Sequence, residues 1–341
     1  MLSYSQRALA DHDLSGPERT TSMFKRILVP LDGSNRAEQA VHVAARIARA
    51  QGGSVILLRV ATAPVDTGKY SSSIGYAEEV VNADLTETSD YLEQVAKSSE
   101  LSGIQTEVKS LTGSVAPAIL SAAESFHADL IVMSSHGYTG FKRWALGSVA
   151  DKITRHSSIA VLVLREGGRE PVPGDHQPVR VLVAVDGSPL SEKVLEPAAY
   201  LTFSLAEATS QQGALHLLRV VDLPAGGGKF KSDAHIDTGT KEQVRHEDEE
   251  YLATLTHRLN AGDLAHLNLA ITSSVEADPD VAEAIVTKAE KEAFDFIAIA
   301  THGRGGVEKW ALGSVAGRVL HASKVPLLIM RPQDVHTAAG S

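Results

Sequence analysis

The sequence predicts an α/β fold that occurs twice in one chain, each copy built on a parallel β-sheet. Three observations lead to this prediction. Short apolar runs alternate with helix-like patterns, which is typical of parallel sheets covered by helices on both faces. The pattern restarts after a stretch rich in glycine and proline at 167–177, which we interpret as a linker. Self-comparison also detects a duplication with a period of roughly 150 residues, which is too long for a solenoid and indicates two similar domains.

Composition narrows the classes of function. The chain has 341 residues, of which 43% are hydrophobic and 22% charged, as is ordinary for two globular domains. It has no cysteine, which excludes disulfides and cysteine nucleophiles and favours a cytoplasmic location. No apolar run has the length of a membrane span, and the N-terminus lacks a signal-peptide pattern, so we expect no membrane partner. The net charge of -10 argues against nucleic-acid binding but allows a small anionic ligand.

The first copy is placed at 23–166, after a polar stretch at 1–22 that we expect to be a flexible tail. An apolar strand over 24–31 opens this domain, and Asp32-Gly33-Ser34 follows as a turn. Ser34 is placed to cap the next helix. Apolar and alanine residues at helical spacing form one face of that helix: Ala37, Ala40, Val41, Ala44, Ala45, Ile47 and Ala48.

The remaining elements of the first copy follow from the same reasoning. Glycine-rich and polar stretches mark loops, and the spacing of apolar residues separates strands from helices. In order, we expect the glycine pair Gly52-Gly53 at the helix end, a strand at 55–60, a long loop at 63–76, a polar amphipathic helix at 78–99, a strand at 104–111, a helix at 116–125, a strand at 130–133, a helix from about Ser148 and a strand at 159–165.

The second copy is placed at 178–333, before a C-terminal tail at 334–341. Its apolar runs repeat the first, second, fourth and fifth strands of the first copy, and lie at 181–185, 215–220, 295–299 and 325–331. Pro189 fits the first position of the helix after the first strand. The run His246–Glu250 is interpreted as an acidic, solvent-facing helix surface.

Each copy contains a glycine-bearing loop between its fourth strand and the following helix. Gly137 is followed after nine residues by Gly147-Ser148, and Gly303 is followed in the same way by Gly313-Ser314. Backbone N–H groups in such a loop, together with the helix dipole, favour an anion such as phosphate. The alternative is a plain helix N-cap, because Gly-Ser before a helix is common for that reason alone.

Asp32 and Asp186 each follow the first strand of their copy. Open parallel sheets bind ligands at the carboxyl ends of their strands, where the strand order reverses. If the first and fourth strands are neighbours there, each aspartate and its glycine loop line one crevice. The alternative role for the aspartates is that of simple turn residues ahead of a cap.

The strand that ends in Asp-Gly-Ser, the later Gly-x9-Gly-Ser and the closing apolar strand together resemble the universal stress protein family, in tandem, from about Phe24 to Arg331. The resemblance implies two open five-stranded parallel sheets of order 3-2-1-4-5 with a Rossmann-like arrangement. It also implies that the two domains pair within the chain through their last strands, and it allows a homodimer. Members of the ATP-binding type bind ATP, which implies ATP here, together with Mg²⁺ or Mn²⁺.

The family's ATP-binding pattern, Gly-x2-Gly-x9-Gly-Ser/Thr, can be carried over residue by residue. The first glycine is replaced by Ser134 in one copy and Ala300 in the other, and both substitutes are small. The resemblance implies that the aspartates lie beside adenine and ribose, that a valine packs on adenine, and that another valine offers its N–H to phosphate. The implied nucleotide-binding residues are Asp32, Val60, Ser134, Gly137, Gly147, Ser148, Val149, Asp186, Val220, Ala300, Gly303, Gly313, Ser314 and Val315.

Three hypotheses for function remain open at this point. The first is an ATP-binding module that acts as a nucleotide-responsive stress regulator on a protein partner of unknown identity. The second is a slow ATP hydrolase or nucleotidyl-transfer enzyme, which rests on fold analogy alone. The third is a structural or assembly member without nucleotide. No arrangement of residues suggests nucleophilic or general-base chemistry, so we predict no catalytic or metal-ligating residues.

Overall fold

In the computed structural model, the described part of the chain comprises residues 23–61, 86–135, 146–165, 178–207, 211–221, 238–301 and 312–331. Strands and helices alternate in both halves, as the apolar runs predict. The strands of the N-terminal half are β1 (Arg26–Leu31), β2 (Ser54–Ala61), β3 (Gln105–Thr112), β4 (Leu130–Ser134) and β5 (Ala160–Leu164). Those of the C-terminal half are β6 (Arg180–Ala184), β7 (Ala214–Val221), β8 (Ala270–Ala277), β9 (Phe296–Ala300) and β10 (Leu327–Met330).

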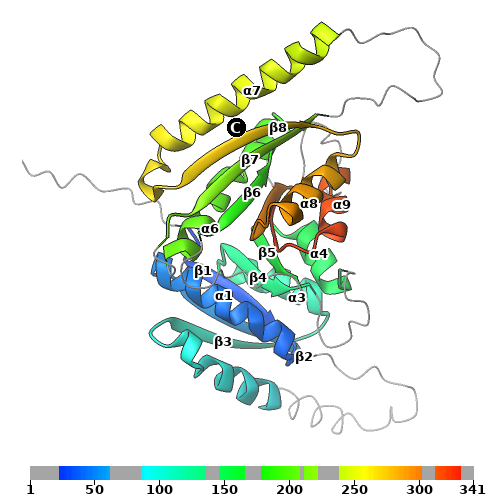
Figure 1. Cartoon of the computed structure of the whole chain (residues 1–341). Coiled ribbons are helices and arrows are strands. Elements are labelled where there is room, and N and C mark those ends of the chain that lie inside the picture. Colours follow the sequence, from blue (N-terminus) through cyan, green and yellow to red (C-terminus); the bar gives the residue numbers. More distant parts are fainter. Residues whose placement is uncertain are drawn as a thin grey trace, which may run out of the picture.

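These strands form one ten-stranded sheet in the order β3-β2-β1-β4-β5-β10-β9-β6-β7-β8 (Figure 1). Neighbouring strands within each half run parallel. Each half therefore has the order 3-2-1-4-5 that the resemblance implied. The first and fourth strands are neighbours in both halves, so their carboxyl ends open onto one crevice in each half.

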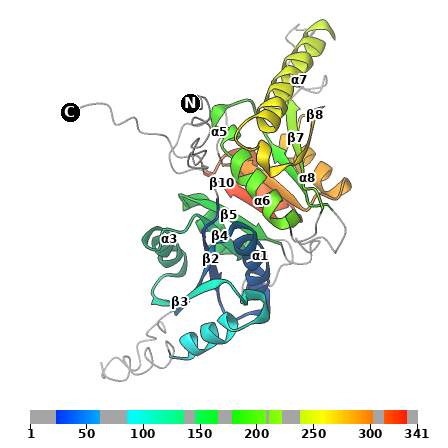
Figure 2. The same cartoon turned by 90° about the vertical axis from the view of Figure 1, so that its left-hand side faces the viewer.

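The two predicted five-stranded sheets are joined into one ten-stranded sheet, because β5 and β10 pair with each other. This confirms the pairing of the two domains through their last strands that the resemblance implied. The two strands pair antiparallel, with Leu162 opposite Leu328. Both strands are almost wholly apolar and buried, and an exposed apolar edge strand would be a template for aggregation. Pairing the two edges with each other removes that exposure. Figure 2 shows the two halves one above the other with β5 and β10 between them.

Helices cover both faces of the sheet, and each face has one apolar core that continues across both halves. The first core lies under α1 (Asn35–Gln51), a helix over residues 86–96, α6 (Leu195–Glu207) and α7 (Thr238–Ala261). The second lies under α3 (Val115–Ser125), α4 (Ser148–His156), α8 (Val281–Lys291) and α9 (Ser314–Ala322). The short elements are η1 (Ser99–Leu101), α5 (Pro189–Glu192) and η2 (Ala265–Leu267).

Local sequence signals account for the start and end of α1. Ser34 accepts a hydrogen bond from the N–H of Ala37 at 3.2 Å, as expected for an N-cap. Gly52 ends the helix in the left-handed conformation with φ 59°, which glycine adopts at low cost. Pro189 occupies the predicted first position of α5. Sequence signals therefore account for both ends of α1 and for the start of α5.

Several predictions fall on other parts of the chain. The tails at 1–22 and 334–341, the loop at 63–76 and the linker at 167–177 lie outside the described residues. The described part of the predicted helix at 78–99 is helical over residues 86–96. Among the described residues, none of the helices has the length and apolar character needed to cross a membrane.

Candidate functional site

The N-terminal half has a pocket of about 430 Å³ at the carboxyl ends of β1, β2 and β4. The N-terminus of α4 closes one side of it, as expected where the strand order reverses. Six of the residues singled out from the sequence line this pocket: Asp32, Val60, Ser134, Gly147, Ser148 and Val149.

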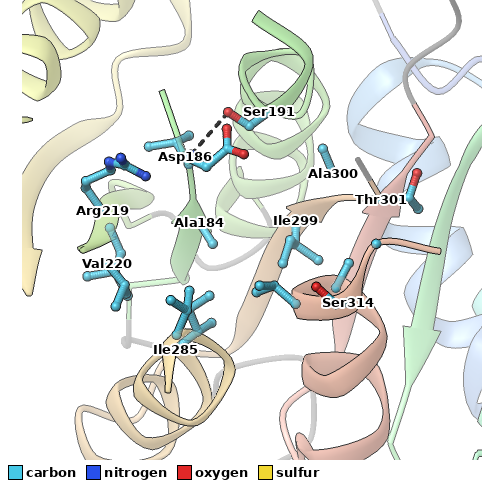
Figure 3. A pocket seen from close by; sticks show the side chains of 16 residues that line it. Ala184, Asp186, Ser191, Arg219, Val220, Ile285, Ile299, Ala300, Thr301 and Ser314 are labelled. Carbon is cyan, nitrogen blue, oxygen red and sulfur yellow. Dashed lines mark hydrogen bonds between the residues drawn. The ribbon is translucent and has the colours of Figure 1, made fainter. Parts of the chain in front are cut away.

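The C-terminal half has an equivalent pocket of about 290 Å³ between the ends of β6, β7 and β9 and the N-terminus of α9. Figure 3 shows Arg219 and Val220 on one side of this pocket and Ser314 on the other. The residues singled out from the sequence that line it are Asp186, Val220, Ala300, Gly313, Ser314 and Val315.

The pockets thus bring together residues that are far apart in the sequence. The glycines at the start of the two loops, Gly137 and Gly303, lie outside the described residues. The same holds for the basic residues of the two loops and for both tryptophans of the chain, which fall within 136–145 and 302–311: Lys142, Arg143, Trp144, Arg304, Lys309 and Trp310.

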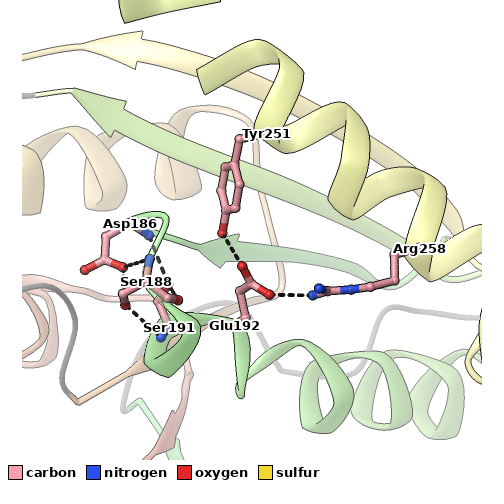
Figure 4. A network of polar contacts seen from close by, with 6 residues as sticks. All are labelled: Asp186, Ser188, Ser191, Glu192, Tyr251 and Arg258. Carbon is pink, nitrogen blue, oxygen red and sulfur yellow. Dashed lines mark hydrogen bonds and ion pairs between the residues drawn. The ribbon is translucent and has the colours of Figure 1, made fainter. Parts of the chain in front are cut away.

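Each Asp-Gly-Ser turn holds its aspartate beside a pocket. In the N-terminal turn, Asp32 Oδ1 accepts hydrogen bonds from the N–H of Ser34 at 3.0 Å and from its hydroxyl at 2.6 Å. Gly33 has φ 86°, a conformation that strains any residue with a Cβ. In the C-terminal turn, Asp186 accepts the same two bonds from Ser188, at 2.9 and 2.6 Å (Figure 4). The aspartates therefore combine the turn role with a fixed position at the pocket wall.

The helices α4 and α9 begin at the pockets without a side-chain cap. Gly147 and Gly313 are their N-cap residues, and glycine has no side chain that could accept a hydrogen bond from the first turn of the helix. The N–H of Gly147 donates to the carbonyl of Ser135 at 2.8 Å, and that of Gly313 to Thr301 at 2.7 Å. The serine after each glycine is the first residue of the helix, not its cap. The N–H groups of the first turn and the positive end of the helix dipole therefore face the pocket, where they favour an anion.

The sequence interpretation missed an arginine at the end of the second strand. Arg59 lines the N-terminal pocket, and its guanidinium carbon lies 5.2 Å from the centroid of the Tyr91 ring. The Tyr91 hydroxyl donates to Glu38 at 2.9 Å, and burial, reinforced by this bond, raises the pKa of the phenol. Thr88 also lines this pocket, and its buried Oγ1 makes no hydrogen bond to any described residue.

The C-terminal half repeats this arrangement with one change. Arg219 donates from Nε to Asp248 at 3.0 Å in a largely buried ion pair. The Tyr251 hydroxyl donates to Glu192 at 3.1 Å, and Arg258 donates to the same carboxylate at 2.6 Å (Figure 4). The interpretation of 246–250 as an acidic surface is therefore wrong at Asp248, which points inward. An Arg-Val pair ending the second strand of each copy is the signal that could have drawn attention to these residues.

A family model described as the Universal stress protein family matches residues 23–165 and 179–331. The chain belongs to the universal stress protein family. The two matched segments make it a tandem member, with one universal stress protein domain in each half of the sheet.

Relatives with known names agree with this assignment. A universal stress protein of Mycobacterium tuberculosis is 28% identical over 214 residues, which cover 61% of this chain and 63% of that protein. The match thus spans less than two thirds of that relative. A universal stress protein of Mycolicibacterium smegmatis is 26% identical over 318 residues, which cover 90% of this chain and 97% of the relative. The crystal structure of a universal stress protein from Archaeoglobus fulgidus shares the fold, with a TM-score of 0.58, 22% identity and coverage of 90% and 98% of the two chains.

Proposed function

We propose that this tandem universal stress protein binds ATP at its strand-end pockets and acts as a nucleotide-responsive stress regulator. The observation that carries the proposal is the uncapped start of α4 and α9 at a Gly-Ser step, beside an aspartate held at the end of the first strand. The same arrangement occurs in both halves. In each, the helix start provides a site for the phosphates, and the aspartate provides a hydrogen-bond acceptor for the polar groups of the nucleoside.

The pocket walls suit the two ends of an adenine nucleotide. Between β2 and α3 the N-terminal pocket has an apolar wall, with Val60, Val115 and Ile119 available to pack on the base. On the side of α4 it offers the backbone N–H groups of the first helical turn to the phosphates. Its volume of about 430 Å³ lies within the range of about 300–1,000 Å³ that is usual for small-molecule sites.

Mg²⁺ or Mn²⁺ would accompany the nucleotide. Phosphate oxygens provide much of the coordination of such an ion in nucleotide sites, so a dedicated set of protein ligands is not needed. The residues of the chain would bind and orient the nucleotide. Asp32 and Asp186 face the ribose end, and Ser148 and Ser314 face the phosphate end.

Intrinsic fluorescence provides the test, because the sequence has two tryptophans, one in each glycine loop. ATP with Mg²⁺ is titrated against the full chain, and nucleotide released on denaturation is identified. We expect saturable quenching, and at 100 times its Kd the nucleotide should raise the free energy of unfolding by about 2.7 kcal/mol. No bound nucleotide, no quenching and no thermal shift at millimolar ATP would instead support the structural or assembly role.

A double variant, Gly147→Val with Gly313→Val, localises the binding. The two glycines have φ -66° and -54° with ψ near 150°, so valine fits the backbone and the fold should persist. The added side chains fill the space in front of the helix starts, and we expect ATP affinity to fall at least tenfold. Unchanged affinity in a variant with a normal melting curve would refute the proposal. Turnover above a few ATP per hour, well below typical enzyme rates, would favour the hydrolase.

A further inference from the structure

The two pockets differ in the partner of the arginine that ends the second strand. Aligning the halves pairs Arg59 with Arg219 and Tyr91 with Tyr251, and both tyrosines donate to a glutamate on the first helical segment. The same alignment pairs Thr88 with Asp248. A neutral hydroxyl in one half therefore corresponds to a carboxylate in the other.

In the C-terminal half this carboxylate neutralises the arginine. The Nε of Arg219 lies 3.0 Å from Asp248 Oδ1, and the two side chains are only 9% and 14% exposed. A guanidinium committed to a buried carboxylate contributes little attraction for a second anion, because the pair has no net charge. Asp32 and Asp186 line their pockets in the same way, so the carboxylate of Asp248 is what makes the charge around Arg219 more negative than that around Arg59.

In the N-terminal half the arginine keeps its charge for a ligand. Arg59 makes no ion pair with any described residue, and its guanidinium lies against the Tyr91 ring. Thr88 is 1% exposed and lines the pocket, and its Oγ1 has no partner among the described side and main chains. Leaving a buried hydroxyl unpaired costs free energy, so a ligand or water that bonds to it is favoured.

The size of the two pockets also favours the N-terminal site for a large ligand. The N-terminal pocket has a volume of about 430 Å³, against about 290 Å³ for the C-terminal pocket.

We infer that the two nucleotide sites are unequal: the N-terminal pocket binds the nucleoside polyphosphate with high affinity through Arg59 and Thr88, and Asp248 weakens the C-terminal pocket by occupying Arg219. This inference rests on the proposed function and adds to it an order of filling. Arg59 supplies positive charge near the bound anion, and Thr88 supplies a buried hydroxyl at the position where the other half has Asp248. The chain then carries one tightly bound nucleotide at concentrations that leave the second site empty.

Single-tryptophan variants resolve the two sites. Trp310→Phe leaves Trp144 as the reporter of the N-terminal loop, and Trp144→Phe leaves Trp310 as the reporter of the C-terminal loop. Each is titrated with ATP and Mg²⁺, and calorimetry on the unmodified chain gives the stoichiometry. We expect the N-terminal site to bind at least tenfold more tightly, a difference of about 1.4 kcal/mol. Equal affinities, or tighter binding at the C-terminal site, would overturn the inference while leaving ATP binding intact.

A reciprocal exchange tests the cause. Thr88→Asp should give Arg59 a carboxylate partner and weaken the N-terminal site about tenfold, without affecting the other site. Asp248→Thr should strengthen the C-terminal site by a similar factor. In each variant the untouched site is the internal control for folding, and Thr88→Asp remains informative if Asp248→Thr is unstable. If neither substitution changes the ATP affinity of the pocket that carries it, the inference is wrong. If ATP binds to no site, the proposed function fails first.

Discussion

Removing the Asp248 carboxylate should destabilise the C-terminal half strongly. Arg219 and Asp248 are 3.0 Å apart with side chains 9% and 14% exposed, so solvent screens the pair poorly. Asp248→Ala leaves a buried guanidinium without its counterion, which typically costs about 3–5 kcal/mol. The helix should remain docked, because Leu252, Leu255 and Leu259 of α7 stay buried against the sheet. The variant is therefore expected to fold, with lower stability.

The assay is urea unfolding followed by fluorescence and circular dichroism, fitted with more than one transition because the chain has two domains. Thr88→Ala is the matched control, because it truncates the aligned position where no ion pair exists, and it should change stability by at most about 1 kcal/mol. Arg219→Met combined with Asp248→Ala removes both charges and should recover most of the loss. A cost below about 1 kcal/mol for Asp248→Ala alone would refute the reasoning.

Two further predictions concern packing and pH. Gly213→Ala would place a Cβ 2.7 Å from Thr202 Cγ2, so we expect a loss of about 1–3 kcal/mol in urea unfolding, whereas Gly317→Ala, with its nearest atom at 3.4 Å, should be neutral or stabilising. Burial, with a smaller contribution from Lys288, lowers the pKa of His216. The folded state therefore prefers the neutral imidazole, and stability should be complete above the ordinary pKa of about 6.5 and fall as the pH decreases through it. His216→Gln should flatten this decrease between about pH 7 and pH 5 in chemical unfolding, and an unchanged slope would assign the decrease to other groups.

The pocket composition could be predicted from sequence because parallel strands put their carboxyl ends at one edge. Asp32 and Ser134 are far apart in the chain, but β1 and β4 are neighbours, so both line the same pocket. The edge strand β8 could not be predicted in the same way. Its sequence from Ala270 to Ala277 is half polar, because one side of an edge strand is solvated, and the apolar run that marked the other strands is missing.

The ion pair of Asp248 was hidden by its neighbours. His246 and Glu250 form an exposed contact at 3.2 Å, and Arg245 and Glu249 form another at 2.9 Å, so most of this segment is the acidic surface that the sequence suggests. The inward direction of Asp248 depends on how α7 is rotated over the sheet. That rotation is set by tertiary packing of the leucines farther along the helix, which charge patterning alone does not reveal.

The antiparallel junction decides how the two pockets can influence each other. Because β5 and β10 run in opposite directions, the strands of the two halves end at opposite edges of the sheet, and no single nucleotide can touch both pockets. The helices that start at the pockets nevertheless approach one another. Asp151 of α4 lies 3.7 Å from His321 of α9, and Arg165 at the end of β5 donates to the carbonyl of Leu320.

These contacts join α4 and β5 to the C-terminal end of α9. If phosphate in the N-terminal pocket displaces α4, the displacement would reach α9 near its C-terminus, and α9, which is nine residues long, begins at the other pocket. Any such coupling is reciprocal. If a nucleotide in the first site changes the affinity of the second site by some factor, a nucleotide in the second site changes the affinity of the first by the same factor. If the two affinities are unequal, as inferred above, this coupling can be measured, since the first site can be saturated before the second begins to fill.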